Sequence, residues 1–218
     1  MKRTAELPGI QLEIEQLRCG ARLVCGVDEA GRGPLAGPVV AAAVVLPLHE
    51  ALPEQLGGLN DSKQLSADKR RHYLSIIRVV ATGMQVGMAT PQEIDALNIR
   101  QASLLAMSRA VAGLSLPLDG FVLVDGRDLP AGLPCPGQAV VRGDRLSLSI
   151  AAASIVAKET RDGLMRQLAD RYPGYGWQHN SGYPTAEHLR ALRILGVTDQ
   201  HRRTFAPVRQ QMAGGFPL

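Results

Sequence analysis

The apolar residues in the first third of the chain follow two patterns. Ile10, Ile14 and Leu17 recur at helical spacing, which predicts a short helix near the N-terminus. Residues 23–27 and 39–46 are short continuous apolar runs, which predict two buried strands. The segment between these runs contains three glycines and two prolines, so it predicts a turn.

The middle of the chain alternates helical and extended patterns. After a loop at residues 47–65, Ser66 is the expected N-cap of a helix that continues to about residue 77. Thr90-Pro91-Gln92-Glu93 combines an N-cap, a proline in the first turn and a capping box, and it predicts one helix to about residue 112, with Leu97 among its buried residues. Three further strands are expected at residues 84–89, 121–124 and 139–141.

The C-terminal third is mostly helical in pattern. An alanine-rich helix is expected at residues 149–172, then a loop at 173–184 where Tyr172, Tyr175, Trp177 and Tyr183 gather with His179. Thr185 caps a further helix that ends at Gly196, and a basic tail follows. The order of elements predicts an α/β protein with a mixed five-stranded sheet flanked by helices. We expect a single domain over residues 1–218, with a core at about 1–172 and a C-terminal helical portion at about 173–218.

Composition excludes several classes of protein. The chain has 218 residues, 45% of them hydrophobic, which is enough for a sizeable core. Its net charge of +4 permits a polyanionic partner without establishing one. Three cysteines without C-x-x-C spacing argue against a disulfide framework and a zinc site, and they favour a reducing, cytoplasmic compartment. No signal peptide and no membrane span are predicted, and a monomer is expected.

Four acidic residues occupy similar places in the pattern. Asp28, Glu29, Asp125 and Asp144 each lie at or just beyond the end of a predicted strand, next to glycine. The ends of central strands meet at one crevice, and clustered carboxylates repel each other unless a cation holds them. Oxygen ligands without His or Cys suit Mg²⁺ or Mn²⁺, and two such ions can hydrolyse a phosphodiester. Asp-Gly and Gly-Asp are also common turn pairs, so the turn interpretation is favoured for Asp125 or Asp144 taken alone.

Other candidates each have an ordinary explanation beside a functional one. Gly31-Arg32-Gly33 is a tight turn, or it presents N–H groups and an arginine to a phosphate or a sugar hydroxyl. Lys63 is a solvated charge or a phosphate contact, and Tyr183 is a packed loop aromatic or a ring that stacks on a ribose or base. The simplest interpretation of His179, His188 and His201 is that they are surface residues, since they have no ligand spacing.

Several motifs occur together and in order. They are Gly26-Val27-Asp28-Glu29-Ala30-Gly31-Arg32-Gly33-Pro34, Asn60-Asp61-Ser62-Lys63, Glu93-Ile94-Asp95-Ala96-Leu97-Asn98-Ile99, Val124-Asp125-Gly126, Gly143-Asp144, Ala153-Ser154-Ile155-Val156-Ala157-Lys158 with Thr160-Arg161-Asp162, and Gly182-Tyr183-Pro184. Taken together, over nearly the whole chain, they resemble the ribonuclease HII family of bacteria.

The resemblance implies a ribonuclease H-like fold and a metal-binding catalytic set of Asp28, Glu29, Asp125 and Asp144. It implies that Gly31-Arg32-Gly33 recognises the ribonucleotide 2′-hydroxyl through its backbone, and that Tyr183 stacks at the following deoxyribose. Such enzymes cut the RNA strand of RNA–DNA hybrids and also cut 5′ of a ribonucleotide embedded in duplex DNA, leaving 5′-phosphate and 3′-hydroxyl ends. Arg32 and Lys63 are further candidates for substrate phosphates.

The chain departs from the family pattern at three positions. Arg127 stands where the family commonly has Asn, Ala151 where it has Ser, and Glu159 where it has Val. None of these changes removes a carboxylate. Two rival functions stay open at this point: a two-metal nuclease that acts on DNA without needing a 2′-hydroxyl, and a non-catalytic module that binds hybrids.

Overall fold

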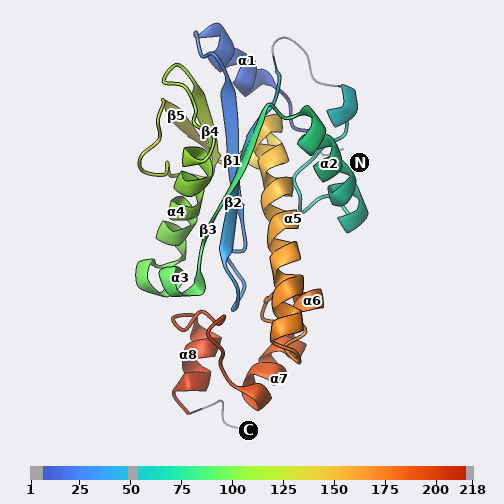
Figure 1. The fold of residues 1–218 in the computed structure, drawn as a ribbon, viewed down its shortest axis with the longest axis vertical. Coiled ribbons are helices and arrows are strands. Elements are labelled where there is room, and N and C mark those ends of the chain that lie inside the picture. Colours follow the sequence, from blue (N-terminus) through green and yellow to red (C-terminus); the bar gives the residue numbers. More distant parts are fainter. Residues whose placement is uncertain (1–6, 49–53, 215–218) are drawn as a thin grey trace, which may run out of the picture.

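The computed structural model describes residues 7–48 and 54–214, and its centre is one mixed sheet (Figure 1). The strands are β1 (Val24–Ala30), β2 (Val39–Val45), β3 (Gly83–Ala89), β4 (Phe121–Asp125) and β5 (Gly137–Val140). Their spatial order is β3-β2-β1-β4-β5. The first three strands are antiparallel neighbours, whereas β4 lies parallel to β1 and β5 lies parallel to β4. The predicted mixed five-stranded sheet is confirmed.

Two strand boundaries differ from the prediction by two or more residues, and the others agree to within one residue. β1 continues to Ala30, so Asp28 and Glu29 lie inside the strand and pair with Ala42 and Ala41 of β2. The apolar run ends at residue 27, but the ladder with β2 continues because its hydrogen bonds need no apolar side chain. β5 begins at Gly137 for the same reason, two residues earlier than expected.

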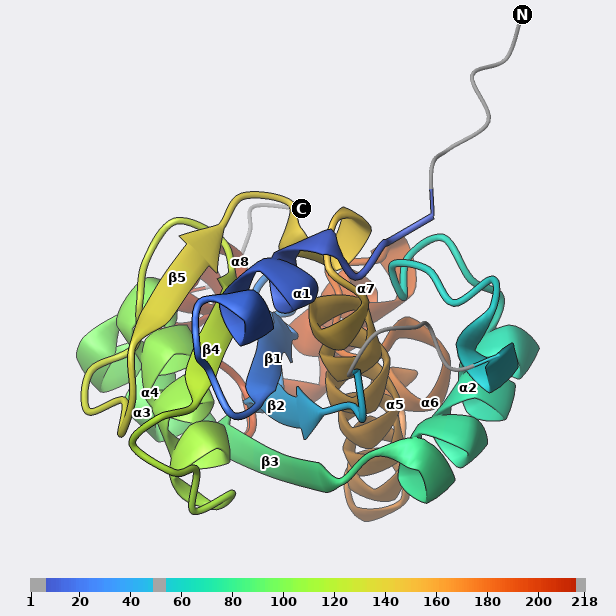
Figure 2. The same cartoon turned by 90° about the horizontal axis from the view of Figure 1, so that it is seen from above.

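Helices cover both faces of the sheet, as Figures 1 and 2 show. α4 (Ile99–Ala112) packs on one face, and α5 (Leu148–Arg171) packs on the other with α2 (Ala67–Val80) beside it. α5 lies so close to β1 that a Cβ at Gly26 would be 2.1 Å from the carbonyl carbon of Ser149. Alanines in the first half of α5 permit this approach, and the predicted alanine-rich helix is confirmed.

The helix predicted from Thr90 to about residue 112 is wrong in one respect. It is two helices, α3 (Pro91–Leu97) and α4, with a break at Asn98, whose φ is +69°. The capping box of Thr90 and Glu93 is present as predicted. Asn98 caps the second helix, because its side-chain oxygen accepts a hydrogen bond from the Gln101 N–H. Leu97 ends the first helix and is 41% exposed, contrary to the expectation that it is buried.

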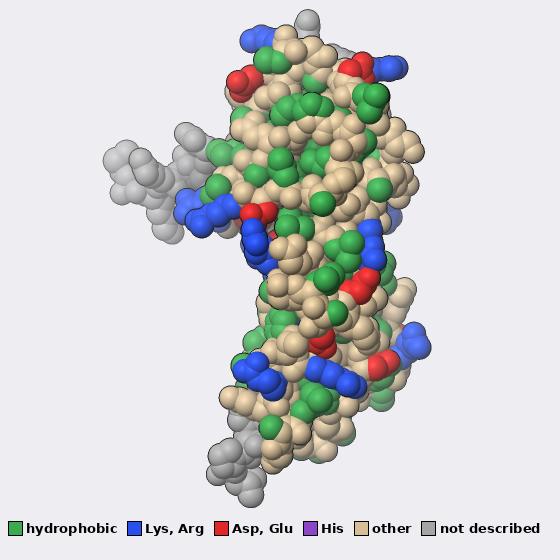
Figure 3. All heavy atoms as spheres, turned by 90° about the vertical axis from the view of Figure 1, so that its left-hand side faces the viewer, with side chains coloured by type: hydrophobic (Ala, Val, Ile, Leu, Met, Phe, Trp, Pro, Cys, Tyr) green, Lys and Arg blue, Asp and Glu red, His purple; other side chains and the backbone are tan. Residues whose placement is uncertain are grey.

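The C-terminal portion lies beyond one end of the sheet, around the far end of α5 (Figure 1). It contains α6 (Trp177–Asn180), α7 (Ala186–Leu195) and α8 (Ala206–Met212). α6 lies in the segment expected to be a loop, and α8 was not predicted. In Figure 3 the molecule narrows between this portion and the part around the sheet, and acidic and basic side chains gather at the narrow region.

Two histidines and one arginine near this end are buried, which corrects the prediction. His188 and His201 are 0% and 1% exposed, and Arg202 is 0% exposed, so residues 201 and 202 do not form a basic tail. The two histidine rings form a hydrogen bond with each other, with their Nε2 atoms 3.3 Å apart. His188 Nε2 also accepts a hydrogen bond from the Trp177 Nε1–H at 3.0 Å. His179 is exposed, as predicted.

The remaining described elements are short. α1 (Gln11–Arg18) is the predicted N-terminal helix, and two single 3₁₀ turns, η1 (Glu54–Leu56) and η2 (Gly143–Arg145), occur in connections. Residues 49–53 of the expected loop at 47–65, and the terminal residues 1–6 and 215–218, lie outside the described residues. Within the described ranges, no helix has both the length and the apolar character that crossing a membrane requires.

Candidate active site

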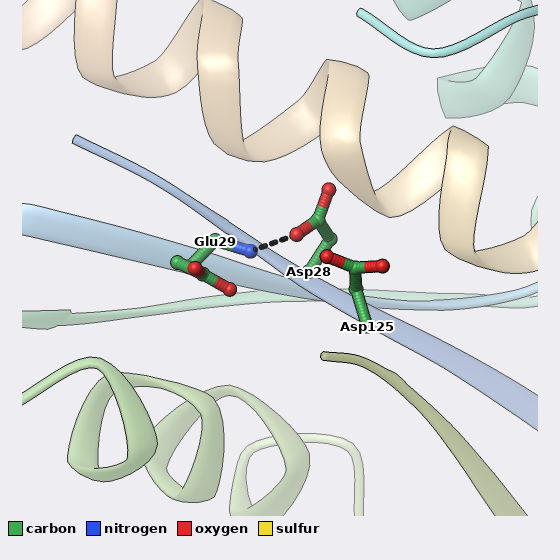
Figure 4. Close-up of side chains that lie close together, drawn as sticks. All are labelled: Asp28, Glu29 and Asp125. Atoms are coloured by element: carbon green, nitrogen blue, oxygen red, sulfur yellow. Dashed lines mark hydrogen bonds between the residues drawn. The ribbon is translucent and has the colours of Figure 1, made fainter. Parts of the chain in front are cut away.

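Three of the four predicted carboxylates come together on the sheet. Asp28 and Glu29 project from β1, and Asp125 is the last residue of β4. One oxygen of each lies within 4.8 Å of one oxygen of each of the others, and Figure 4 shows the three side chains around β1 with a helix passing nearby. The parallel pairing of Val27 with Val124 explains this, because it places the following residues, Asp28 and Asp125, side by side on neighbouring strands.

Backbone hydrogen bonds fix two of these carboxylates. The Gly143 N–H donates to Asp125 Oδ1 at 2.7 Å, and the Asp144 N–H donates to the same oxygen at 3.4 Å. The Glu29 N–H donates to Asp28 Oδ1 at 2.7 Å. In each case the second carboxylate oxygen has no such bond within the described residues, so it can serve another ligand.

Asp144 lies beside the three-carboxylate group and not within it. It is 6% exposed and sits in η2, where its Oδ2 is 3.8 Å from the Lys63 Nζ. Asp61, which is 1% exposed, also acts on Asp144 electrostatically, and its Oδ2 lies 3.7 Å from the Arg145 Nε. The structure therefore brings three of the four predicted acids into one group and places the fourth next to it.

Two of these acids, Asp28 and Asp125, hold protons more tightly than exposed carboxylates do. Burial raises the pKa of Asp28 well above its usual range, and the charges of Glu29 and Asp125 raise it further. Burial also raises the pKa of Asp125, and the charge of Glu29 adds to this effect, while the bonds from Gly143 and Asp144 oppose it. The arrangement is therefore electrostatically unfavourable without a compensating positive charge.

Burial and nearby charges also shift the pKa values of Asp144 and Lys63, which lie beside the three-carboxylate group. Burial, with the charges of Asp61 and Asp125, raises the pKa of Asp144, and the charge of Lys63 opposes this. Burial alone would lower the pKa of Lys63, but the nearby acids raise it, so the lysine stays charged. Lys63 pairs with Asp144 and Arg32 pairs with Glu29, but no Lys or Arg among the described residues forms an ion pair with Asp28 or Asp125.

A divalent cation fits this donor set. Asp28, Glu29 and Asp125 offer only carboxylate oxygens, and no described His or Cys belongs to their group. Hard oxygen ligands of this kind bind Mg²⁺ and Mn²⁺. A cation between them would remove the mutual repulsion that raises the pKa of Asp28 and Asp125.

A cavity of about 170 Å³ opens beside the acids. Its lining includes acids, glycines, cations and one aromatic ring: Asp28, Glu29, Ala30, Gly31, Arg32, Gly33, Ser62, Lys63, Lys158, Arg161 and Tyr183. Gly33 faces the ring of Tyr183, since a Cβ at Gly33 would be 3.5 Å from its Cε1. The predicted turn, Lys63 and Tyr183, which are far apart in sequence, therefore line one cavity together with two of the predicted acids.

Gly31 has to be glycine for two reasons. Its φ is +98°, and a Cβ there would be 2.0 Å from Arg161 Nε. The side chain of Arg32 folds back so that its Nη1 lies 3.2 Å from Glu29 Oε1. Its guanidinium is thus paired with one of the acids in this structure, although the prediction assigned it to a substrate phosphate.

Three residues at the site were not singled out from the sequence. Lys158 and Arg161 line the cavity from α5, and Asp61 is buried next to Asp144. Asp61 lies two residues before Lys63 in a motif that was noticed, so its position could have been inferred. Lys158 and Arg161 also belong to a motif named from the sequence, but their helical pattern does not show that the turn containing Ala36, 125 residues before Arg161, packs against that helix.

Comparison with known proteins settles the family. Residues 25–208 match the family model described as Ribonuclease HII. The chain belongs to the ribonuclease HII family. A relative named Ribonuclease HII from Rhodospirillum rubrum is 57% identical over 209 residues, which are 95% of this chain and 93% of the relative. A second, from Magnetococcus marinus, is 57% identical over 207 residues, 93% of this chain and 94% of the relative.

Solved structures agree with this assignment. Ribonuclease H2 from Pyrococcus horikoshii superposes with a TM-score of 0.73 at 30% identity, covering 88% of this chain and 97% of that one. Bst-RNase HIII, solved in complex with Mn²⁺, superposes with a TM-score of 0.68 at 18% identity, covering 91% of this chain and 71% of that one, which shows the shared fold. The chain is therefore a ribonuclease H, an endonuclease and phosphodiester hydrolase with a ribonuclease H-like fold, and its family is metal-dependent and acts on RNA–DNA hybrids.

The three departures from the ribonuclease HII pattern lie in different surroundings. Arg127 is exposed, and Ala151 is a buried residue of α5 that belongs to the core between this helix and the sheet. Glu159 is 8% exposed and accepts a hydrogen bond from Arg70 Nε at 2.7 Å. The same guanidinium donates to the Ser62 and Leu65 carbonyls, so Glu159 helps to hold the loop before α2 that carries Lys63.

Proposed function

We propose that this ribonuclease HII incises duplex DNA 5′ of an embedded ribonucleotide, as well as the RNA strand of RNA–DNA hybrids, and leaves 5′-phosphate and 3′-hydroxyl ends. One observation carries the proposal: Asp28 and Glu29 line the same cavity as Gly31 and Gly33. A single bound substrate could therefore contact both the carboxylates that would hold a metal and the glycine turn that would contact its sugar. Such incision would begin the repair of DNA that contains ribonucleotides. The protein would act in the cytoplasm and as a monomer.

The carboxylates would provide the catalytic metal site. Asp28 and Asp144 would hold the metals next to the scissile phosphate, and Glu29 and Asp125 would complete the set of metal ligands. Two divalent ions, Mg²⁺ or Mn²⁺, supply activation of the attacking water and stabilisation of the leaving oxygen. The second oxygens of Asp28 and Asp125, which accept no backbone bond, support this assignment.

The cavity wall would select the sugar. The backbone of Gly31-Arg32-Gly33 would contact the 2′-hydroxyl, and the half-exposed ring of Tyr183 would stack at the following deoxyribose. Lys63, whose side chain is 76% exposed, would reach a substrate phosphate, and Arg32 would do so after leaving Glu29. Gly33 and the ring of Tyr183 lie next to each other in the cavity lining, which supports a shared task, because a sugar bound in the cavity would be able to touch both.

Paired substitutions test the roles of the acids and the ring. Asp125→Asn keeps an Oδ1 that can accept from Gly143 and Asp144, so we expect the fold to persist while metal-dependent cleavage falls by at least about 100-fold. Tyr183→Ala should weaken cleavage at a single ribonucleotide by about tenfold and affect long hybrids less. Normal cleavage by Asp125→Asn would contradict the metal assignment. Equal loss on every substrate by Tyr183→Ala would show that the ring only supports the fold.

A further inference from the structure

Two buried arginines stand behind the turn that lines the cavity. Arg161 of α5 and Arg202, which follows α7, are 1% and 0% exposed. Neither forms an ion pair with a carboxylate in the described part of the chain. Burial lowers the pKa of Arg161 to about 10 and that of Arg202 to about 9, which leaves both charged at neutral pH. A buried charge without a counter-ion is unfavourable unless several hydrogen bonds stabilise it.

Those hydrogen bonds all go to backbone carbonyl groups, and most of them lie in one turn. Arg202 donates to the carbonyls of Gly31 at 2.6 Å, Arg32 at 3.0 Å, Gly37 at 3.0 Å and Pro38 at 3.3 Å. Arg161 donates to the carbonyls of Pro38 at 3.0 Å, Ala36 at 3.1 Å and Ser181 at 3.0 Å. Of the two, only Arg202 donates hydrogen bonds at the glycine end of the turn, to the carbonyls of Gly31 and Arg32.

The contact with these two carbonyls fixes the direction of two amides. In a trans peptide the C=O and the following N–H point to opposite sides of one plane, and no described peptide is cis. The carbonyls of Gly31 and Arg32 point to Arg202, so the N–H groups of Arg32 and Gly33 point away from it. Neither N–H donates a hydrogen bond to any residue in the described ranges, and both residues line the cavity beside the acids.

We infer that Arg202 is a positioning residue for ribose selection: its guanidinium holds the peptide planes whose N–H groups, at Arg32 and Gly33, meet the 2′-hydroxyl. The inference rests on the proposed function. It assigns a role in that function to Arg202, which lies 170 positions after Arg32 of the turn that it orients. The C-terminal portion thereby belongs to substrate recognition, because it supplies the group that aims the donors.

The side chain of Arg202 can be changed without undocking its segment. The Arg202 N–H donates to the Leu35 carbonyl at 2.8 Å, and the Gly37 N–H donates to the Gln200 carbonyl at 2.8 Å, both through backbone atoms. A substitution at 202 leaves these bonds in place. A purely structural role would lower stability and reduce all rates by a common factor, whereas a positioning role lowers the preference for ribose.

The test compares Arg202→Lys and Arg202→Ala with Arg209→Ala, an exposed arginine of α8 that donates one bond to the Thr204 carbonyl. Substrates are one duplex with a single ribonucleotide and the same duplex with a 2′-fluoro-2′-deoxynucleotide at that position. We expect Arg202→Lys to remain folded with Mn²⁺ binding unchanged, while kcat for the ribonucleotide falls about tenfold or more and the ratio of the two rates falls with it. Arg209→Ala should behave as the wild type.

Chemical rescue separates orientation from packing. Arg202→Ala leaves a space that methylguanidinium can enter, so millimolar methylguanidinium should restore the ribonucleotide rate of this variant and leave the wild type unchanged. A folded Arg202→Lys with the wild-type rate ratio, or a parallel loss on both substrates without rescue, would overturn the inference. The wild type alone reports on the proposed function. If the wild type lacks a preference for ribose, both proposals fail; if the wild type prefers ribose and the Arg202 variants keep the same preference, this inference alone fails.

Discussion

Replacing Asp28 by Asn should stabilise the metal-free protein while it abolishes cleavage. The side chain is 4% exposed and its pKa is raised by burial and by the charges of Glu29 and Asp125. Asn removes the charge but keeps an Oδ1 that can accept the bond from the Glu29 N–H at 2.7 Å. The substitution therefore isolates the unfavourable electrostatic interaction from the hydrogen bonding.

The size of the effect follows from proton linkage. Between the usual pKa of a carboxylate and the raised pKa of Asp28, the folded state binds more protons than the unfolded state, so stability falls as pH rises through that window. Each unit of elevation corresponds to about 1.4 kcal/mol of lost stability at a pH above both values. For a domain of this size, that is a rise of roughly 3–6 °C in Tm per unit once the charge is removed.

The assay is thermal unfolding at pH 7.5 with and without Mn²⁺. Without metal, Asp28→Asn should melt above the wild type, and Asp119→Asn, which removes an exposed carboxylate and changes the net charge equally, should not. Mn²⁺ at 100 times its Kd should stabilise the wild type by about 2.7 kcal/mol and the Asp28 variant by much less. A metal-free Asp28→Asn that melts below the wild type would refute the reasoning, because the carboxylate would then support the fold.

Three further results are expected. Gly33→Ala should leave stability within about 0.5 kcal/mol of the wild type, since its Cβ would make only an ordinary contact with Tyr183, but it should slow incision at a ribonucleotide by about tenfold because the methyl group enters the cavity. Glu159→Gln should lower the free energy of unfolding by about 2–3 kcal/mol, because it weakens a buried charge-assisted bond from Arg70. Burial lowers the pKa of His201 to about 3, so below pH 6.5 this ring takes up a proton in the unfolded chain but stays neutral in the folded one. The free energy of unfolding should therefore fall by up to about 1.4 kcal/mol for each pH unit below 6.5.

Each of these has a matched control. Gly33→Ala is compared for melting and incision rate with Gly163→Ala in α5, where φ is not left-handed and a Cβ would have only Arg166 Nη2, at 3.8 Å, within 4 Å. Glu159→Gln is compared in urea unfolding with Asp68→Asn, which breaks an exposed pair with Arg71 and should change stability by less than about 1 kcal/mol. A His201→Gln variant should show a shallower loss of stability between pH 6.5 and 5. An unchanged slope would rule out that histidine as the source.

Strands such as β2 and β4 were predictable because their cores are continuous apolar runs bounded by glycine or proline. The end of β1 was not, since β1 extends through Asp28 and Glu29 on the strength of backbone bonds to a neighbour that the sequence does not reveal. The break at Asn98 was missed for a related reason. The capping signal at Thr90 is local and strong, but the second cap lies inside a stretch where the residue pattern permits one helix.

Site residues were predictable where a short sequence pattern around the residue indicates its role. Acids next to glycine at strand ends gave Asp28 and Asp125, and the parallel pairing of β1 with β4 brings them together. His201 and Arg202 carry no such signal. A buried histidine is stable only because another ring thirteen residues earlier accepts its bond, and a buried arginine only because a distant turn presents its carbonyls. These partners appear only when the chain is folded.

The central claim is that one cavity combines a metal site with a test for ribose. The most direct measurement is incision of a duplex that carries a single ribonucleotide, beside an identical all-DNA duplex, with Mg²⁺, with Mn²⁺ and with neither. We predict a single cut 5′ of the ribonucleotide that requires a metal, with no cut in the all-DNA duplex. Cutting of the all-DNA duplex, or incision that persists without metal, would contradict the account.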